Sequence, residues 1–251
     1  MKKFFALAAI AALLFACGEK PNNDEPNNKP NPNEPEQPVT PSVDYDCLKG
    51  TNYFPIIMDA TTYNSISSKV VADLRVDDYN TWLWIWENTY VAGTSTGPNY
   101  FGEVDGWVAL QVGSVGWSGA GFCCYDAAKL SKLADITANP QDYVFHVAMK
   151  SQDTATHELV MYSDDGSEAK VQIDVDGLYG YARDGEWYGI EIPMTTFTNQ
   201  GLLWTANLGA GAVPGDNVNT APTGGHNILA VLSGNFGALN MDACFIYKPA
   251  K

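Results

Sequence analysis

The chain has 251 residues and a net charge of −15, with no run of lysine or arginine beyond residue 43. Attraction to phosphate is the basis of nucleic-acid binding, so this charge argues against nucleic acid as a partner. It also disfavours anionic polysaccharides, unless a local basic pocket overrides it. Neutral ligands fit the composition best.

The first sixteen residues have the pattern of a secretory signal. Lys2 and Lys3 precede the apolar run 4–15, which is shorter than the roughly 20 residues that span a bilayer but suits a signal-peptide core. The run ends in Leu14-Phe15-Ala16-Cys17, which resembles the bacterial lipobox. We expect residues 1–16 to be removed and Cys17 to carry lipid. The alternative is an ordinary signal peptide followed by an incidental cysteine.

Residues 17–43 contain the lipidated cysteine and then a linker of proline, asparagine, glutamate and lysine, with seven of the fourteen prolines. Such a segment buries too little apolar surface to fold and acts as a semi-rigid spacer. Gly18-Glu19-Lys20 resembles the surface-export signal of Bacteroidetes lipoproteins. We therefore expect a protein anchored to the outer membrane by its lipid alone, on the cell surface or on the periplasmic face.

Residues 44–251 are expected to form one all-β domain, a jelly-roll β-sandwich. Runs rich in β-branched and aromatic residues alternate with Gly, Asn and Asp turns, which is typical of sandwiches. One segment, Asp126–Ile136, has the apolar spacing of a helix. The runs predict strands at Tyr53–Asp59, Val70–Val76, Thr81–Trp86, Trp107–Val112, Tyr143–Met149, Glu158–Tyr162, Ala169–Val175, Trp187–Ile192, Ile228–Ser233 and Asp242–Tyr247.

Four cysteines remain after Cys17. An exported domain can form disulfides, and four cysteines allow three pairings, but four buried free thiols are an equally good interpretation. Adjacent Cys123 and Cys124 would point to opposite faces of a strand. Cys47 and Cys244 lie near the two ends of the domain, where terminal strands often pair.

The densest aromatic cluster is Thr81-Trp82-Leu83-Trp84-Ile85-Trp86. In a strand the three indoles share one face and the two aliphatic side chains share the other. If Leu83 and Ile85 enter the core, the indoles form an exposed platform; the opposite arrangement buries the indoles. Trp82 is expected to be the most exposed of the three and Trp86 the most buried.

Further candidate ligand contacts lie in three loops. Loops at a sandwich rim carry recognition more often than strands do, and flat aromatic rings suit sugar stacking. Aromatic plugs that close the sandwich are the structural alternative. The candidates are Asn99 and Tyr100 in the loop 87–106, Trp117 in the glycine-rich loop 113–121, Asn207 in the loop 205–225, and Trp204 directly before that loop.

Two motifs carry a family resemblance. The segment 184–193 (DGEWYGIEIP) resembles a strand of galactose-binding-like jelly rolls and related carbohydrate-binding modules, and the segment 239–247 (LNMDACFIY) resembles their closing strand. With the lipobox and linker, the whole chain resembles a Bacteroidetes surface glycan-binding lipoprotein. The resemblance implies that Trp187 is a core residue and that outer-membrane transporters are partners. It also implies a structural calcium ion, for which Asp59 and Asp242 are the matching positions.

Catalytic patterns are weak. Glycoside hydrolysis needs two carboxylates at a set separation, whereas Glu186 and Glu191 lie five residues apart and would face opposite sides of a straight strand. His146 sits between Phe145 and Val147 as a strand histidine. The sequence therefore predicts a non-catalytic, carbohydrate-binding surface lipoprotein that captures a neutral polysaccharide or oligosaccharide by aromatic stacking. A structural or adhesive protein that uses the same aromatics for protein contacts is the second hypothesis, and a glycoside hydrolase is the third.

Overall fold

A computed structural model describes residues 45–77, 79–93, 97–104, 106–112, 116–215, 222–233 and 238–251. The expected signal peptide, Cys17 and the linker 17–43 lie outside these residues. The chain divides into two units at residues 42 and 43, and every described residue belongs to the second. Within the described residues, no helix has both the length and the apolar character needed to cross a membrane.

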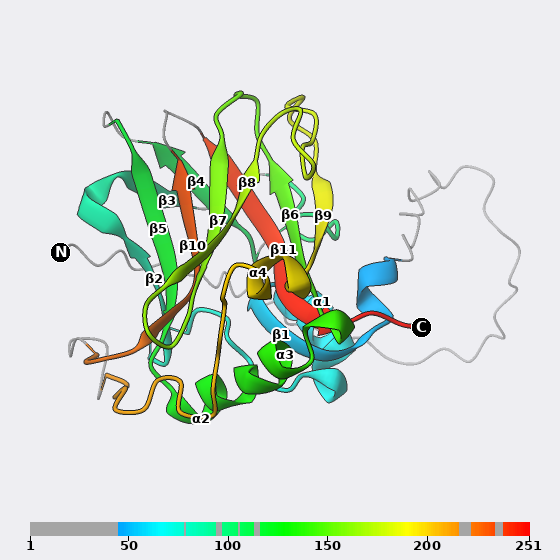
Figure 1. The fold of residues 1–251 in the computed structure, drawn as a ribbon. Helices are drawn as coiled ribbons and strands as arrows, with labels where there is room; N and C mark the ends of the chain where they lie inside the picture. Colours follow the sequence, from blue (N-terminus) through cyan, green and yellow to red (C-terminus); the bar gives the residue numbers. More distant parts are fainter. Residues whose placement is uncertain are drawn as a thin grey trace, which may run out of the picture. The chain divides into compact units, whose positions relative to one another are not determined.

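The domain is a sandwich of two antiparallel sheets (Figure 1). In sheet 1 the order is β3-β4-β11-β6-β9, and β1 also pairs with β11; in sheet 2 the order is β2-β5-β10-β7-β8. The strands of sheet 1 are β1 (Thr51–Ile57), β3 (Tyr90–Gly93), β4 (Val108–Val112), β6 (Val144–Lys150), β9 (Tyr188–Pro193) and β11 (Leu239–Lys248). Those of sheet 2 are β2 (Thr81–Ile85), β5 (Ser118–Cys124), β7 (His157–Tyr162), β8 (Glu168–Ile173) and β10 (His226–Ser233).

The expected all-β jelly-roll sandwich is confirmed. From β4 onward the chain crosses to the other sheet at every step except the β7–β8 hairpin. Alternating side chains therefore enter a single core between the sheets, where Phe54, Phe122 and Phe145 are fully buried. The side chains on the outer face of each sheet do not reach this core and pack in separate clusters.

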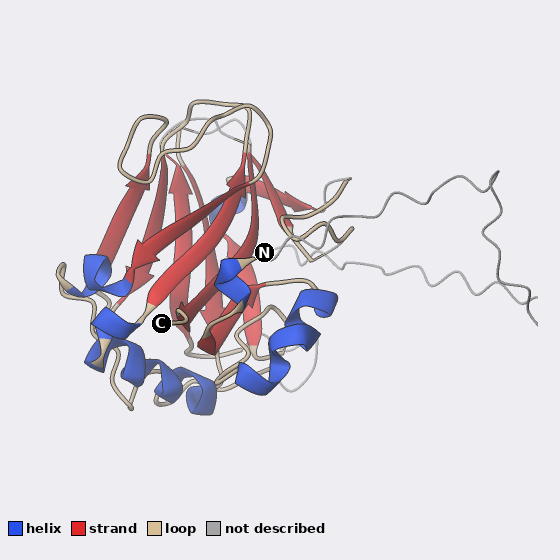
Figure 2. Cartoon of the chain, turned by 90° about the vertical axis from the view of Figure 1, so that its right-hand side faces the viewer, coloured by secondary structure: helices blue, strands red, loops and turns tan. Residues whose placement is uncertain are grey.

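Helical segments are short and gather mostly around one end of the sandwich (Figure 2). The predicted helix is confirmed as α2 (Ala127–Leu130), a 3-10 turn and α3 (Ala134–Ala138), and the Asp126 side chain caps its first N–H groups. The expectation of a single helix is wrong, because α1 (Ala60–Ile66) and α4 (Met194–Thr198) are also present. Asp59 starts α1 by accepting a hydrogen bond from the Thr62 N–H, as N-cap residues do.

Nine of the ten predicted strands are present, with shifted ends. Val70–Val76 is wrong as a strand: Val70 makes only a single bridge to Tyr53, and the Asp73 carboxylate then binds the Arg75 N–H and guanidinium in a local turn. Strands β3 and β5 were not predicted. Strand β5 begins Ser-Gly-Ala-Gly, and its glycines hide the alternation of buried side chains.

The cysteines of the domain are all buried free thiols. Cys124 lies in the main core, whereas Cys123 lies in a separate cluster on the other side of β5, which confirms that the pair points to opposite faces. Cys244 lies between the sheets and Cys47 lies on the far side of sheet 1. A Cys47–Cys244 bridge is therefore not formed.

Candidate functional site

The outer face of sheet 2 carries the tryptophans of strand β2. Leu83 and Ile85 pack against the main core, whereas Trp82 and Trp84 form a separate cluster on the opposite side of the strand. The structure thus adopts the arrangement in which the aliphatic pair enters the core. Strand β2 is an edge strand, so its indoles stand at the border of the sheet.

Trp82 and Trp84 form a stacked pair. Their ring centroids lie 5.7 Å apart and the ring planes are inclined by 16°. The Trp84 indole N–H donates to the Tyr125 hydroxyl at 3.0 Å, and that of Trp82 donates to the Tyr79 carbonyl at 3.3 Å. Trp82 is only 7% exposed, so the expectation that it is the most exposed of the three is wrong. Trp84 is half-buried and offers the accessible ring of the pair.

Trp86 and Trp117 extend the aromatic surface across strand β5. A Cβ atom on Gly119 would lie 2.5 Å from Cε3 of Trp86 and 2.8 Å from Cζ3 of Trp117. Both indoles therefore rest against the β5 backbone at a position without a side chain. Trp86 is half-buried, contrary to the expectation that it lies in the core, and Trp117 is 43% exposed as one interpretation allowed. We call Trp82, Trp84, Trp86 and Trp117 the aromatic row.

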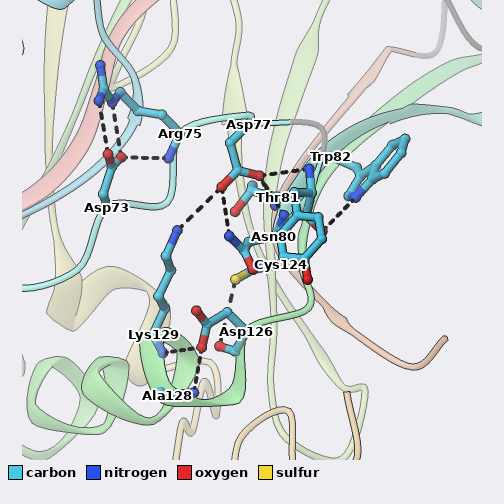
Figure 3. Close-up of polar contacts among 11 residues, drawn as sticks. Asp73, Arg75, Asp77, Asn80, Thr81, Trp82, Cys124, Asp126, Ala128 and Lys129 are labelled. Carbon is cyan, nitrogen blue, oxygen red and sulfur yellow. Dashed lines mark hydrogen bonds and ion pairs between the residues drawn. The ribbon is translucent and has the colours of Figure 1, made fainter. Parts of the chain in front are cut away.

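A turn centred on Asp77 fixes the start of β2. Its carboxylate accepts hydrogen bonds from the N–H groups of Tyr79, Asn80 and Thr81 and lies 3.6 Å from the Lys129 ammonium (Figure 3). Burial alone would raise the pKa of this carboxyl, but the Thr81 N–H and the groups of Asn80 and Tyr79 hold it below its ordinary value. The turn places the Tyr79 carbonyl where it accepts a hydrogen bond from the Trp82 indole N–H.

Polar side chains occupy the other side of the same face. In β10, Asn227 lies opposite Cys123 of β5 and Ala230 lies opposite Gly121. Strand β7 pairs with the other side of β10, and β8 pairs with β7 at the edge of the sheet. On these last two strands the Glu158 carboxylate accepts a hydrogen bond from the Gln172 amide at 3.2 Å, and the Lys170 ammonium lies 3.0 Å from the Glu168 carboxylate. We call Glu158, Glu168, Lys170 and Gln172 the polar strip. The face therefore joins flat rings at one edge to hydrogen-bonding groups at the other.

The outer face of sheet 1 is covered by the chain itself. Tyr100 packs against Tyr45, Phe101 and the His146 ring, and its N–H donates to Asp242. It is half-buried on the side of the molecule away from the aromatic row. Asn99 is 3% exposed, with its amide donating to Asp59 and its carbonyl accepting from two backbone N–H groups. Asn99 is therefore closed off from a ligand, contrary to expectation, whereas the expected ligand contact of Tyr100 stays a prediction.

Trp204 was also misplaced by sequence reasoning. It is 2% exposed in the main core, with its indole N–H donating to the Tyr162 carbonyl, so its expected role in stacking is wrong. Asn207, three residues on, is exposed in a series of turns. Trp187 is half-buried and packs edge-on against Trp107 on the outer side of sheet 1, in a second cluster outside the main core.

Two buried carboxylates meet beside β1 and β11. Asp59 and Asp242 are 1% and 0% exposed, and Oδ1 of Asp242 has no hydrogen-bond partner within the described residues. Burial, and secondarily the charge of Asp59, raises the pKa of Asp242 to about 7. Oxygen ligands and uncompensated negative charge suit Ca²⁺. In the described part of the chain, no group of three or more Asp, Glu, His or Cys residues is placed to hold a metal ion.

Titratable groups on sheet 1 have structural partners. The Nδ1–H of His146 donates to the Ala243 carbonyl at 2.6 Å, and burial lowers the pKa of His146 to about 4. This confirms His146 as a satisfied strand histidine. Burial raises the pKa of Glu191 to about 7, although the Tyr247 hydroxyl donates to it at 3.1 Å.

A pocket of about 510 Å³ lies away from the aromatic row. Its lining residues are Lys150, Ser151, Gln152, Asp153, Gly185, Ala238 and Asn240. None of them is aromatic. The pocket therefore offers hydrogen bonds but no surface for stacking.

The chain matches no family model and no curated protein. Among solved structures it is similar to the family 11 carbohydrate-binding module of a cellulosomal cellulase of Clostridium thermocellum, at 13% identity and a TM-score of 0.36, covering 68% of this chain and 88% of that one. A mutant family 29 carbohydrate-binding module complexed with mannohexaose gives 9% identity and a TM-score of 0.36, covering 78% and 90% of the two chains. A Clostridium thermocellum xylanase fragment complexed with xylohexaose is similar at 15% identity and a TM-score of 0.35, and the match covers 69% of this chain and 28% of that one. Likenesses this distant do not define the ligand of the present protein.

Sequence reasoning missed several residues of the site. Trp86 was assigned to the core, and Gly119, Gly121 and Tyr125 were not singled out. The missing signal was strand β5 itself: once the segment 118–124 is paired with β2, register alone puts its glycines beneath the tryptophans.

Proposed function

We propose that the outer face of sheet 2 binds carbohydrate without catalysis. One observation carries the proposal: Trp82 and Trp84 share the outward side of edge strand β2, and Trp86, directly after the strand, and Trp117 extend this row over the glycines of β5, with Trp117 against Gly119. Aromatic faces stack on the C–H-rich faces of sugar rings, and rigid side chains lose little entropy in doing so. The polar strip supplies partners for the hydroxyl groups at the ring edges.

The charges on this face favour a neutral saccharide. The polar strip contains Glu158 and Glu168 against Lys170 alone, and the whole chain carries −15. An anionic sugar would meet carboxylates on the face where its hydroxyls need partners. We therefore infer a neutral polysaccharide or oligosaccharide as the ligand.

The position in the cell is also a proposal. We infer from the residues around Cys17 that lipid anchors the protein to the outer membrane, with the linker 17–43 holding the domain off the membrane surface. In this position it would hand glycans to outer-membrane transporters. Labelling with a radioactive fatty acid tests the anchor: the wild type should incorporate label and Cys17→Ser should not.

A structural calcium ion is a further part of the proposal. Asp59 and Asp242 would hold it, and the Asp242 Oδ1 that lacks a partner is the support for this assignment. The ion would neutralise two buried carboxylates and join the end of β1 to β11. It would act on stability and not on the saccharide, since Asp242 lies in β11 of the other sheet and Asp59 caps the helix that follows β1 of that sheet.

A native-gel retention screen of the wild-type domain tests the proposed ligand. Gels containing neutral glucan, mannan, xylan or galactan should slow the protein in at least one case, and gels containing polygalacturonate or alginate should not. If every neutral polysaccharide leaves the mobility unchanged, the carbohydrate proposal fails. Capture of a surface protein that is lost in Trp117→Ala would then support the second hypothesis, in which the same exposed aromatics, Trp117 among them, make protein contacts.

A further inference from the structure

Strand β5 carries glycine at the two positions where its outer side faces Trp86. A Cβ atom on Gly119 would lie 2.5 Å from Trp86 Cε3, and one on Gly121 would lie 3.1 Å from Trp86 Cζ2. These carbons are on opposite sides of the six-membered ring of the indole. The ring therefore lies in the space that side chains at these two positions of β5 would fill, and at Gly121 it shares that space with Oδ1 of Asn227, 2.9 Å from the Cβ position.

The backbone that follows Trp86 is held in an unfavourable conformation. Glu87 and Asn88 have φ values of 51° and 56°, in the left-handed region that residues with a Cβ atom rarely adopt. Both side chains are exposed, so their own packing does not explain the strain. Strained backbone of this kind persists where the surrounding structure over-determines it and is often found at functional sites.

Thr89 fastens this turn to β5. Its hydroxyl donates to the Trp86 carbonyl at 2.7 Å and accepts from the Gly119 N–H at 3.0 Å. The Ser118 hydroxyl donates back to the Thr89 carbonyl. The turn that carries Trp86 is thus hydrogen-bonded to the same residue on which the Trp86 ring rests.

We propose that Gly119, Gly121 and the left-handed pair Glu87 and Asn88 are positioning residues that fix the Trp86 indole as a ligand-stacking surface. This inference rests on the proposed function, because it assigns Trp86 to the saccharide site. Without a glycine at 119 or 121 the indole would be pushed off β5. Without the strained turn it would be free to leave the sheet.

Double-mutant cycles in affinity gels test the proposal. Gly121→Ala should weaken retention by the polysaccharide that the wild type binds by about tenfold, as Trp86→Ala should, with a melting temperature close to that of the wild type. Adding Gly121→Ala to Trp86→Ala should cause no further loss. Gly116→Ala is the matched control, because a Cβ atom there has no neighbour within 4 Å, and it should bind as the wild type does.

A second pair of variants tests the turn. Glu87→Gly with Asn88→Gly relieves the left-handed strain, so the melting temperature should not fall while retention weakens. Two outcomes would overturn the proposal. In the first, Gly121→Ala weakens binding equally in the wild type and in Trp86→Ala; in the second, neither Gly121→Ala nor the double variant at Glu87 and Asn88 changes binding.

Acrylamide quenching of tryptophan fluorescence separates this inference from the proposed function. Gly121→Ala should increase quenching in the wild-type background and leave it unchanged in the Trp86→Ala background. If quenching behaves so but no polysaccharide binds, the saccharide function fails and the positioning of Trp86 stands. If quenching does not change, the positioning role is wrong whatever the protein binds.

Discussion

The indole of Trp84 lies stacked on that of Trp82 while its N–H donates to the hydroxyl of Tyr125, the residue directly after the neighbouring strand β5. One face of the Trp84 ring is thus used by the protein, and the in-plane hydrogen bond fixes the ring's orientation. This leaves a half-buried ring with little freedom to lose on binding. Preorganised rings at a sheet edge are what saccharide stacking requires.

Loss of the Asp77 carboxylate should disturb the start of this row. Asp77→Ala removes the acceptor of three backbone N–H groups, and we expect a loss of about 2 kcal/mol of unfolding free energy. Binding should also weaken, because the turn sets the position of Trp82. Asp184→Ala removes another turn acceptor, in the loop before β9 of the opposite sheet, where it accepts from the Glu186 N–H and the Tyr188 hydroxyl. It should leave binding intact in the same urea and gel measurements.

Trp204 should matter for stability and not for binding. Trp204→Phe keeps a buried ring but removes the indole N–H, which is one of the two groups that hydrogen-bond to the Tyr162 carbonyl; the other is Nε2 of His226. We expect urea unfolding at a lower midpoint, with a loss of about 1–3 kcal/mol of unfolding free energy. The folded protein should keep its affinity for polysaccharide. Weakened binding at unchanged stability would return Trp204 to the ligand site.

Calcium should stabilise the domain through Asp59 and Asp242. At a calcium concentration about a hundredfold above the dissociation constant, the gain should be about 2.7 kcal/mol. We expect a higher melting temperature in calcium than in EDTA, and no such difference in Asp242→Asn. Glu191→Gln, which alters a different carboxyl, on strand β9 of sheet 1, should keep the response. Identical melting of the wild type in calcium and EDTA would remove the metal from the account.

Acid should destabilise the protein through His157. This side chain is fully buried, and burial, together with the positive charge of Arg183 and against the charge of Asp153, lowers its pKa to about 4. Because the folded state binds this proton less readily than the unfolded chain, unfolding free energy falls as pH drops from about 6.5 to 4. The loss from this group should approach roughly 3 kcal/mol.

The comparison of the wild type with His157→Leu isolates this effect. Asp242 and Glu191 have raised pKa values and change stability in the opposite direction over the same range, while His146 acts in the same direction. The stability difference between the two proteins should therefore shrink from pH 7 to pH 4 in urea titrations. A difference that is constant with pH would contradict the neutral state of His157.

Sequence patterns predicted the sandwich well, because polar and apolar residues alternate in strands such as β8, and their side chains are alternately exposed and buried. They failed for β5, where glycine replaces the side chains that would show alternation. They also failed for Asn99 and Trp204, since polar and aromatic residues in loops look alike whether a loop is open or folded inward. The outward direction of Trp84 was predictable only as one of two alternatives, and the pairing of β2 with β5 decides between them.

The most direct test compares affinity-gel retention of the wild type, of Trp84→Ala with Trp117→Ala, and of Trp187→Ala, whose ring lies on the other sheet. On the neutral polysaccharide that slows the wild type, the double variant should migrate as if no polysaccharide were present, and Trp187→Ala should be slowed as the wild type is. Undiminished retention of a folded double variant, or equal loss in Trp187→Ala, would contradict saccharide binding by the aromatic row.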